Sequence, residues 1–467
     1  MKLTAPDPTF YPSARLAMEG PREELGYVVA LAADGASPKK VSDALAVVDL
    51  NPESPEYGTI LNWMSVPTVG DEFHHFGWNA CSSALCPYAP HPHLERRYLV
   101  IPGIRSSRIY IVDTKADPRR PEIVKQIEPE ELIRKTGYTR PHTVHCGPDG
   151  IYVSALGDAK GDGPGGIFIL DHFSFEPLGR WEMERGPQFF SYDFWWHINQ
   201  DILVSSEWGV PWMLENGLLP DQLMQGAYGR ALHVWDIRKR RHIQKLDLGE
   251  NQQMVLEVRP AHDPRKSYGF TGVVLSLVDL SSSVWLWYRD GDRWAIRKVI
   301  EIPAEPAKEA ELPPLLKSFR AVPPVLTDID LSLDDRYLYL SCWGTGDLLQ
   351  YDVTDPFHPK RVSSLHLGGI TRRGAHPRAP QNPLNGGCQM VEVSRDGRRV
   401  YLTNSLYRAW DDQFYPEGIR GWMALAHAGE EGLHWDERFF VEFPSTHRPH
   451  QIRLQGGDCS TDSFCFP

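Results

Sequence analysis

A stretch of alternating apolar residues, usually ending in an acid, recurs seven times in this chain of 467 residues. The copies occupy residues 46–49, 109–113, 167–171, 232–236, 284–288, 348–352 and 422–426. Each copy is followed by a polar turn and a second apolar strand, and the copies end 52 to 74 residues apart. Repeated strands of this kind are typical of propellers, in which each repeat forms one blade. The sequence therefore predicts an all-β fold, a seven-bladed β-propeller with long inter-strand loops.

The repeats run through the whole chain and predict one propeller domain over residues 1–467, although this length alone suggests several domains. Residues 1–26 are expected to be irregular, because their prolines interrupt any longer helix. Near the other end, residues 450–454 form a strand candidate with no later copy to join. We expect residues 450–467 to close the ring by pairing with the N-terminal strands, which removes exposed sheet edges.

Charge and cysteine content limit the classes of partner and compartment. The formal net charge is −12, with no run of Lys or Arg, which argues against nucleic acid and against a polybasic membrane patch. No apolar run approaches the roughly 20 residues that span a bilayer, and the N-terminus lacks the apolar core of a signal peptide. Seven cysteines, an odd number, predict free thiols in a reducing compartment. We expect a cytoplasmic protein, or a periplasmic one if a leader was removed.

Histidines gather in three distant segments, the first of which shows no helical or strand periodicity. These segments are DEFHHFGWNACSS at residues 71–83, RPHTVHCG at 140–147 and STHRPHQIRLQGGDCS at 445–460. Loops at equivalent blade positions converge on the central channel of a propeller, so the three segments can meet there. The candidate metal ligands are His74, His75, His142, His145 and His450.

The residue types in these segments restrict the metal. Imidazole suits copper, zinc, iron and nickel, and a set with few carboxylates argues against magnesium or calcium. The alternative is that these histidines are ordinary buried residues and that the nearby cysteines are structural. We interpret His197, which follows an aromatic run, as a packing residue.

Longer motifs indicate a family. They are GPREE (20–24), HHFGWNACSS (74–83), SSRIYIVD (106–113), HTVHC (142–146), YDFWW (192–196), LTDIDLSLDDRYLY (326–339), SLYRAWDDQFYP (405–416) and GGDCSTD (456–462). With these motifs in this order, the chain resembles the selenium-binding protein family, whose members include methanethiol oxidases. The similarity extends over nearly the whole chain.

The resemblance implies a fold, an activity and a metal. It implies a seven-bladed propeller, in agreement with the repeats, and oxidation of methanethiol by O2 and water to formaldehyde, hydrogen sulfide and hydrogen peroxide. Bacterial members are regarded as copper-dependent, and the family's metal histidines map onto the five candidates above.

Two departures from the family pattern weaken a role in selenium binding. Gly58 stands where animal members have a cysteine, and the family's CSSC is stretched here between Cys81 and Cys86.

Two function hypotheses follow. The first is a copper-dependent thiol oxidase that acts on a small thiol with O2. In this enzyme Cys81 is a candidate catalytic residue, and Glu72, Glu207 and Asp328 are candidates for proton transfer. The second is a non-catalytic propeller that carries a metal or selenium species, or serves as an interaction platform. The sequence carries no signal for an oligomeric state.

Overall fold

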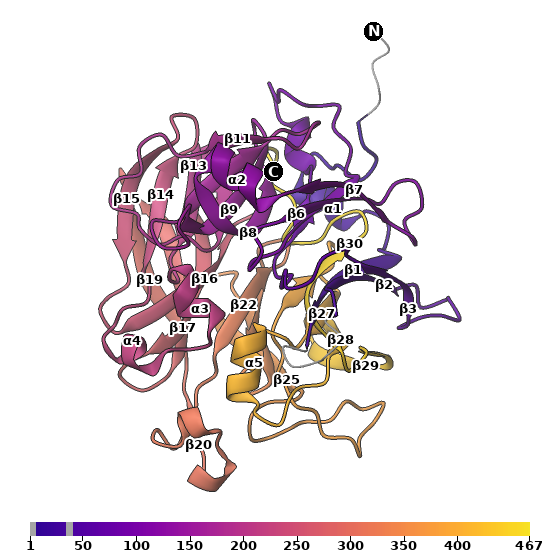
Figure 1. The fold of residues 1–467 in the computed structure, drawn as a ribbon, viewed down its shortest axis with the longest axis vertical. Coiled ribbons are helices and arrows are strands. Elements are labelled where there is room, and N and C mark those ends of the chain that lie inside the picture. The colour runs from indigo at the N-terminus through magenta and orange to yellow at the C-terminus, as the bar shows by residue number, and fades with distance from the viewer. Residues whose placement is uncertain (1–5, 34–40) are drawn as a thin grey trace.

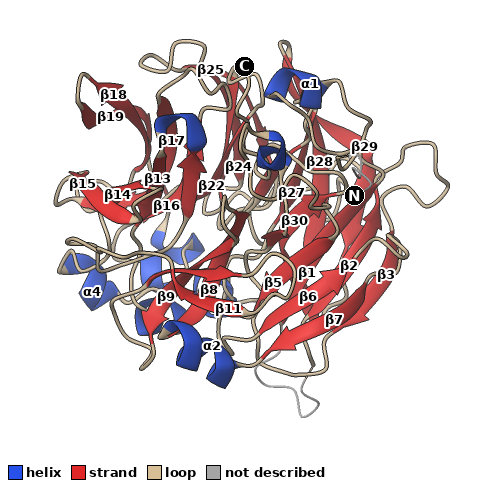
Figure 2. Ribbon diagram, turned by 90° about the horizontal axis from the view of Figure 1, so that it is seen from above, coloured by secondary structure: helices blue, strands red, loops and turns tan. Residues whose placement is uncertain are grey.

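Seven four-stranded antiparallel sheets are arranged as a ring, so the predicted seven-bladed β-propeller is confirmed. The computed structural model describes residues 6–33 and 41–467. The sheets radiate from a common centre (Figures 1 and 2), and the labels of β8, β16, β22 and β30 surround the middle of the molecule in Figure 2. Because each blade is a sheet packed face to face against its neighbours, nearly all of its second and third strands are buried.

The blades are numbered here from the ring closure, each with its strands from the innermost outward. Blade 1 contains β30 (His447–Leu454), β1 (Leu25–Ala32), β2 (Ala44–Asp49) and β3 (Ile60–Ser65). Blade 2 contains β4 (Gly77–Trp78), β5 (Tyr98–Pro102), β6 (Ile109–Asp113) and β7 (Glu122–Ile127). Blade 3 contains β8 (Tyr138–Cys146), β9 (Ile151–Asp158), β10 (Gly166–Leu170) and β11 (Pro177–Arg180). Blade 4 contains β12 (Phe194–His197), β13 (Ile202–Ser206), β14 (Ala231–Asp236) and β15 (Arg241–Asp247).

The remaining three blades follow the same order. Blade 5 contains β16 (Gln252–Pro260), β17 (Tyr268–Ser276), β18 (Ser282–Asp290) and β19 (Arg293–Ile302). Blade 6 contains β22 (Leu326–Leu331), β23 (Tyr337–Cys342), β24 (Asp347–Asp352) and β25 (Lys360–His366). Blade 7 contains β26 (Val391–Val393), β27 (Arg399–Thr403), β28 (Trp422–Gly429) and β29 (Gly432–Glu442). Every repeat identified in the sequence is the third strand of its blade.

The ring closes by pairing between the two ends of the chain, as predicted. In blade 1 the innermost strand β30 lies antiparallel to β1, with Gly26 opposite Leu454 and Val28 opposite Ile452. The strand begins at His447, three residues before the expected start. The hydrogen bonds between β30 and β1 replace the free edge that either strand would otherwise expose.

Helices are few and short. They are α1 (Ala14–Met18), α2 (Pro129–Thr136), α3 (Pro211–Glu215), α4 (Pro220–Met224) and α5 (Arg408–Phe414), with 3-10 turns η1 (Ser82–Leu85), η2 (Ile198–Gln200), η3 (Glu309–Glu311) and η4 (Pro314–Leu316). Among the described residues, no helix is both long enough and apolar enough to cross a membrane. Between blades 5 and 6 the chain forms a projecting segment with the two-stranded sheet β20 (Glu305–Pro306) and β21 (Ala321–Val322), low in Figure 1.

The prediction that residues 1–26 are irregular is wrong in two places. Helix α1 forms between two prolines, with the Ser13 hydroxyl accepting from the Leu16 amide, and β1 already begins at Leu25. One helical turn fits between the prolines because a turn of five residues needs few internal hydrogen bonds. Residues 1–5 of the segment lie outside the described residues.

Polar side chains from one blade bind the inner edge of the next. An innermost strand has no further strand to pair with, so its backbone amides need other acceptors. Asp193 accepts from the Val258 amide on β16 at 2.7 Å, and Asp328 accepts from the Val391 amide on β26 at 2.8 Å. Gln451 on β30 accepts from the Phe76 amide at 2.6 Å. These bonds hold neighbouring blades together around the buried centre.

The expectation of free thiols is wrong for four of the seven cysteines. Cys81 is joined to Cys146, and Cys86 to Cys465, with Cα separations of 6.1 and 5.4 Å. The remaining three cysteines are buried thiols. The first pair meets because Cys81 follows β4, and Cys146 ends the innermost strand of the adjacent blade. The sequence does not reveal which four of seven cysteines pair. With two disulfides present, the cysteine content no longer argues for a reducing compartment.

Thiol counting tests this pairing. Protein that is denatured without reductant should expose about three titratable thiols, because the other four sulfurs are in disulfides. The same protein should show all seven after reduction, as measured with a chromogenic thiol reagent. A count of seven before reduction would contradict the pairing.

Candidate metal centre

Four histidines meet in the middle of the propeller, where the innermost strands of three neighbouring blades approach one another. His450 lies on β30, His142 on β8, and His74 and His75 in the segment just before β4. The His74 ring stacks on His450 at a centroid distance of 3.6 Å, and the His75 ring lies 4.2 Å from that of His142. All four side chains are buried. The structure therefore brings together four of the five predicted ligands.

Backbone constraints place the histidine pair at this point. A Cβ atom on Gly77 would overlap the carbonyl oxygen of Val144 on β8, so only glycine allows β4 to approach β8 this closely. Glu72 adopts a left-handed backbone with φ of 54°. Its carboxylate pairs with Arg105 and accepts from the Arg408 amide at 2.9 Å, which holds this unfavourable turn in place.

Hydrogen bonds fix the tautomers of two of the rings. His450 Nδ1 lies 2.6 Å from the carbonyl oxygen of Ser405, which can only accept, so Nδ1 carries the proton. His142 Nδ1 lies 2.9 Å from the Thr143 hydroxyl, which donates its own proton to Asp193 at 2.8 Å. The hydroxyl therefore accepts from His142 Nδ1. Both histidines are left with a bare lone pair on Nε2.

Three buried imidazole nitrogens in the cluster have no hydrogen-bond partner among the described residues: His74 Nδ1, His142 Nε2 and His450 Nε2. Leaving a buried polar atom unpartnered costs about 1–3 kcal/mol. Histidines that ligate metals characteristically donate the other ring N–H to a carbonyl or carboxylate, as His450 does directly and His142 does through Thr143. The donor set therefore fits a transition metal that accepts imidazole.

The histidines are neutral at physiological pH. Burial lowers the pKa of His74, His75 and His142 well below the ordinary range, and neighbouring histidines add to the effect. Burial also lowers the pKa of His450 to about 3. A neutral imidazole keeps the lone pair that a metal requires.

Two acids that the sequence analysis missed complete the surroundings. Glu257 on β16 lies 3.5 Å from His75 Nε2, and ligand atoms of His75, Asp193 and Glu257 all lie within 4.8 Å of one another. Burial raises the pKa of Glu257 well above its ordinary range, and Asp193 adds to the rise. The sequence signal for Glu257 is its place between apolar residues, in MVLEV at 254–258. A buried glutamate is costly unless it is paired, so such a position indicates a partner.

A buried ion network lies next to these acids. Arg259 contacts Glu257 at 3.1 Å, Asp328 at 3.2 Å, Asp193 at 3.5 Å and Asp330 at 3.7 Å. These residues come from blades 4, 5 and 6. Burial raises the pKa of Asp328 to about 7 and of Asp330 to about 8, with Arg259 opposing the rise. One guanidinium thus compensates a group of acids that could not otherwise be buried together.

Aromatic rings also pack against the cluster. Tyr407 stacks on His74 at 4.1 Å, and Tyr192 lies 4.1 Å from His142. Trp208 packs against both tyrosines, at 5.6 and 4.7 Å. The histidines therefore contact both a buried acid and aromatic rings.

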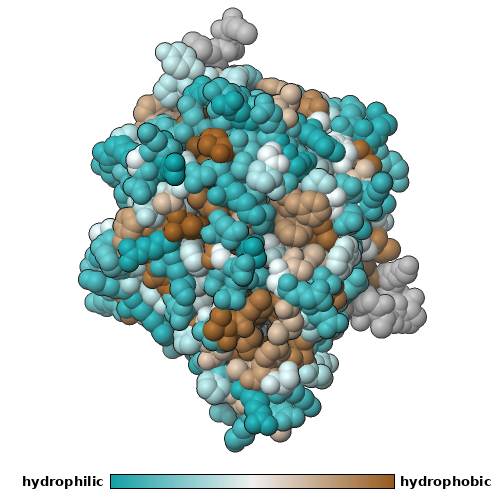
Figure 3. All heavy atoms as spheres, turned by 90° about the vertical axis from the view of Figure 1, so that its left-hand side faces the viewer, coloured by the Kyte–Doolittle hydropathy of each residue, from teal (hydrophilic) through white to brown (hydrophobic). Residues whose placement is uncertain are grey.

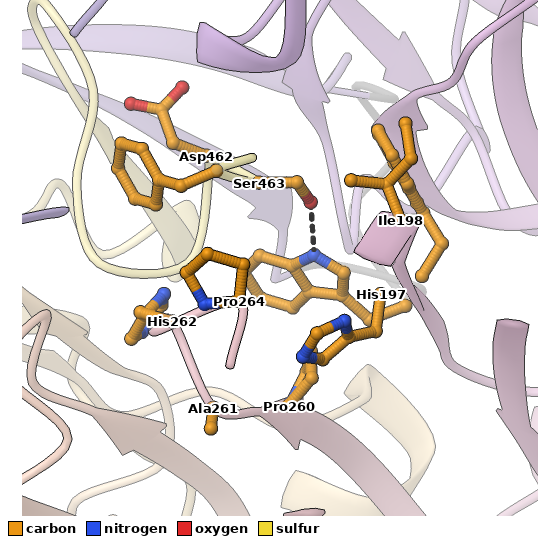
Figure 4. A pocket seen from close by; sticks show the side chains of 11 residues that line it. His197, Ile198, Pro260, Ala261, His262, Pro264, Asp462 and Ser463 are labelled. Atoms are coloured by element: carbon orange, nitrogen blue, oxygen red, sulfur yellow. Dashed lines mark hydrogen bonds between the residues drawn. The ribbon is translucent and has the colours of Figure 1, made fainter. Parts of the chain in front are cut away.

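His145, the fifth predicted ligand, does not join the cluster. It lies on β8 three residues after His142, which is about 10 Å along a strand, so the two cannot bind one ion at about 2 Å. Its ring packs on Trp195 at 4.6 Å. The Trp195 indole donates to Ser463 at 2.9 Å, the dashed bond in Figure 4. Trp195 and Ser463 line a pocket together with His197. The Nε2 atom of His197 lies 2.9 Å from the Lys266 carbonyl oxygen, which agrees with a packing role.

The residues predicted for catalysis have other partners. Glu72 is paired with Arg105, Glu207 lies 2.8 Å from His233 Nε2, and Asp328 belongs to the Arg259 network. Cys81 is in a disulfide, which removes the free thiol that a catalytic role requires. Spacing could not foresee these partners, because each belongs to a segment distant in sequence.

The model of the 56kDa selenium binding protein family (SBP56) matches residues 4–465. This chain belongs to that family. It is 39% identical to a Xenopus tropicalis relative named methanethiol oxidase, over 96% of both chains. A human relative of the same name is 37% identical, again over 96% of both chains.

A solved structure in the selenium-binding protein family has the same fold throughout. The hypothetical selenium-binding protein from Sulfolobus tokodaii superimposes with a TM-score of 0.95 at 55% identity. The match covers 99% of this chain and all of the other. The seven blades are therefore arranged alike in the two proteins.

Paired histidine variants test the composition of the cluster. His142→Ala removes a donor nitrogen and should weaken Cu²⁺ affinity by at least tenfold in a competition titration with a chromogenic chelator. His145→Ala removes an equally buried imidazole outside the cluster and should leave the affinity within about twofold. Equal losses in the two variants would contradict the cluster as described.

The Arg259 network generates a stability prediction. Arg259→Ala leaves buried carboxylates without a cation and should lower the unfolding free energy by about 3–5 kcal/mol in denaturant titration. Arg265→Ala, which breaks an exposed pair with Asp263, is the control and should cause no measurable change. A stable Arg259→Ala protein would show that the network does not hold the blades together.

Proposed function

We propose that this protein is a copper-dependent thiol oxidase. In this proposal it converts methanethiol, O2 and water to formaldehyde, hydrogen sulfide and hydrogen peroxide. The observation that carries the proposal is the buried cluster of neutral histidines with three unpartnered ring nitrogens. The name methanethiol oxidase, given to relatives that align over nearly the full length, supports the choice of substrate.

Copper suits the donor set better than a hard cation does. Imidazole nitrogens bind copper well, while magnesium and calcium prefer oxygen ligands. His74, His75 and His142 would hold the ion, with His450 as a further donor. Bound copper would supply thiolate coordination and electron transfer to O2.

The residues around the histidines would position the ligands and exclude water. Ser405 and Thr143 orient the rings of His450 and His142, so their lone pairs are directed before any ligand arrives. Tyr192 and Tyr407 are buried against the cluster and present aromatic faces to it. An apolar wall of this kind suits methanethiol, whose only hydrogen-bond donor is its weak S–H group.

The alternative of a selenium carrier gains less support. Cys81 and Cys86 are in separate disulfides, so neither offers a thiol until it is reduced. Gly58 has a φ of 71°, a conformation that a cysteine rarely adopts. A metal-carrying propeller without catalysis remains the alternative that the test below addresses.

Metal analysis combined with oxygen uptake tests the function. Protein produced with copper should contain about one copper per chain and consume O2 when methanethiol is added, with formaldehyde and hydrogen peroxide formed in equal amounts. A chelator should abolish the uptake, and added Cu²⁺ should restore it. Copper-loaded protein that consumes no O2 with methanethiol would favour the carrier, and protein that binds no copper would overturn the proposal.

A further inference from the structure

An apolar cavity lies between α4, η4, β17 and α5. It encloses about 40 Å³, and every side chain that lines it is Leu, Val, Met, Pro, Phe or Trp. Two of these side chains are at the surface, with Met224 63% exposed and Phe319 38% exposed. Figure 3 shows a brown area in the lower half of one face of the molecule. The cavity therefore reaches solvent, although its walls are apolar.

The size and chemistry of the cavity define what it can bind. A cavity needs about 10–15 Å³ to hold one water, so this space holds roughly three heavy atoms. Its walls offer no hydrogen bond, since even the Trp410 indole N–H is donated to the Leu214 carbonyl oxygen at 2.9 Å. Apolar cavities of this kind stay dry and bind small uncharged molecules.

Aromatic rings connect the inner end of the cavity to the histidines. Trp410 lines the cavity and packs edge-on against Trp208 at 5.3 Å. Trp208 contacts Tyr407, which stacks on His74. All of these side chains belong to a single apolar cluster or lie against it. A continuous chain of aromatic contacts therefore links the cavity with the histidines.

Trp208 also has a free donor on this route. Its Nε1 is buried and has no hydrogen-bond partner within residues 6–33 and 41–467. The Trp208 side chain is 1% exposed, so solvent does not satisfy this N–H. A buried indole N–H without a partner can accommodate a weak acceptor such as a sulfur atom.

The surroundings of the histidine cluster differ in polarity. Glu257, which is paired with Arg259, lies beside His75, whereas the rings of Tyr407, Trp208 and Trp410 connect His74 with an apolar cluster. A free alkyl thiol is mostly protonated in neutral water and enters as an uncharged molecule. We infer that the apolar cavity is the entry site for the substrate, and that it binds small uncharged alkanethiols before they pass Trp410 and Trp208 to reach the histidines. This inference rests on the proposed function.

Xenon is the first probe, because it reports the cavity independently of catalysis. Crystals of the wild-type protein under xenon pressure should show an electron-density peak between Leu223, Val274 and Phe414. Val274→Phe, which fills the cavity from β17, should remove the peak. A wild-type crystal without xenon at this place would overturn the inference.

Kinetics of the same variants test entry. Val274→Phe should raise the KM for methanethiol at least tenfold, with kcat and copper content within twofold of wild type, because binding in the cavity precedes the chemistry. Leu223→Ala enlarges the cavity and should raise kcat/KM for 1-propanethiol relative to methanethiol by at least fivefold. Val362→Phe on the exposed strand β25 is the control and should change neither value.

The possible failures are distinguishable. If wild-type protein oxidises methanethiol and Val274→Phe leaves its KM unchanged, the entry site is wrong and the proposed function stands. If copper-loaded wild-type protein oxidises no thiol, the proposed function and the entry role both fail, while xenon in the cavity would still mark a site for apolar molecules. If Val274→Phe does not fold, Leu223→Ala decides, and an unchanged preference between the two thiols overturns the inference.

Discussion

The structure depends on how the inner edges of the seven innermost strands are satisfied where no further strand pairs with them. Carboxylates and amides of one blade accept the backbone amides of the next, as Asp193, Asp328 and Gln451 do. Those acids are themselves buried and need a cation, which Arg259 supplies between blades 4, 5 and 6. A polar centre is therefore a requirement of the ring, and ionic groups gather there before any question of function arises.

The histidine cluster lies beside this ion network. Burial keeps the rings neutral, and the contacts with Ser405 and Thr143 leave Nε2 of His450 and His142 free to bind a ligand. The cluster borders the Arg259 network through Glu257 and borders an apolar region through Tyr407 and Tyr192. The four rings thus contact both ionic groups and aromatic side chains.

Errors in the sequence-based predictions share one cause. His145 has the same type and neighbourhood as His142, and the two differ only in their place along β8, which the sequence does not reveal. Glu72, Glu207 and Asp328 are acids near conspicuous motifs, but their partners come from distant segments. Glu257 was missed because it lies on β16, outside the three histidine-containing segments. Spacing within a segment predicts local geometry, whereas partners across a propeller depend on which blades are adjacent.

The sequence by itself determined the fold and the family. The second and third strands of most blades are largely apolar because both faces pack on neighbouring blades, so seven blades could be counted without a structure. The closure by β30 also followed, since a last strand without a partner must pair with the first. Only the tertiary structure decided which histidines meet, which acids join them and which cysteines pair. Those contacts join segments that are distant in sequence and belong mostly to different blades, so no pattern within one segment predicts them.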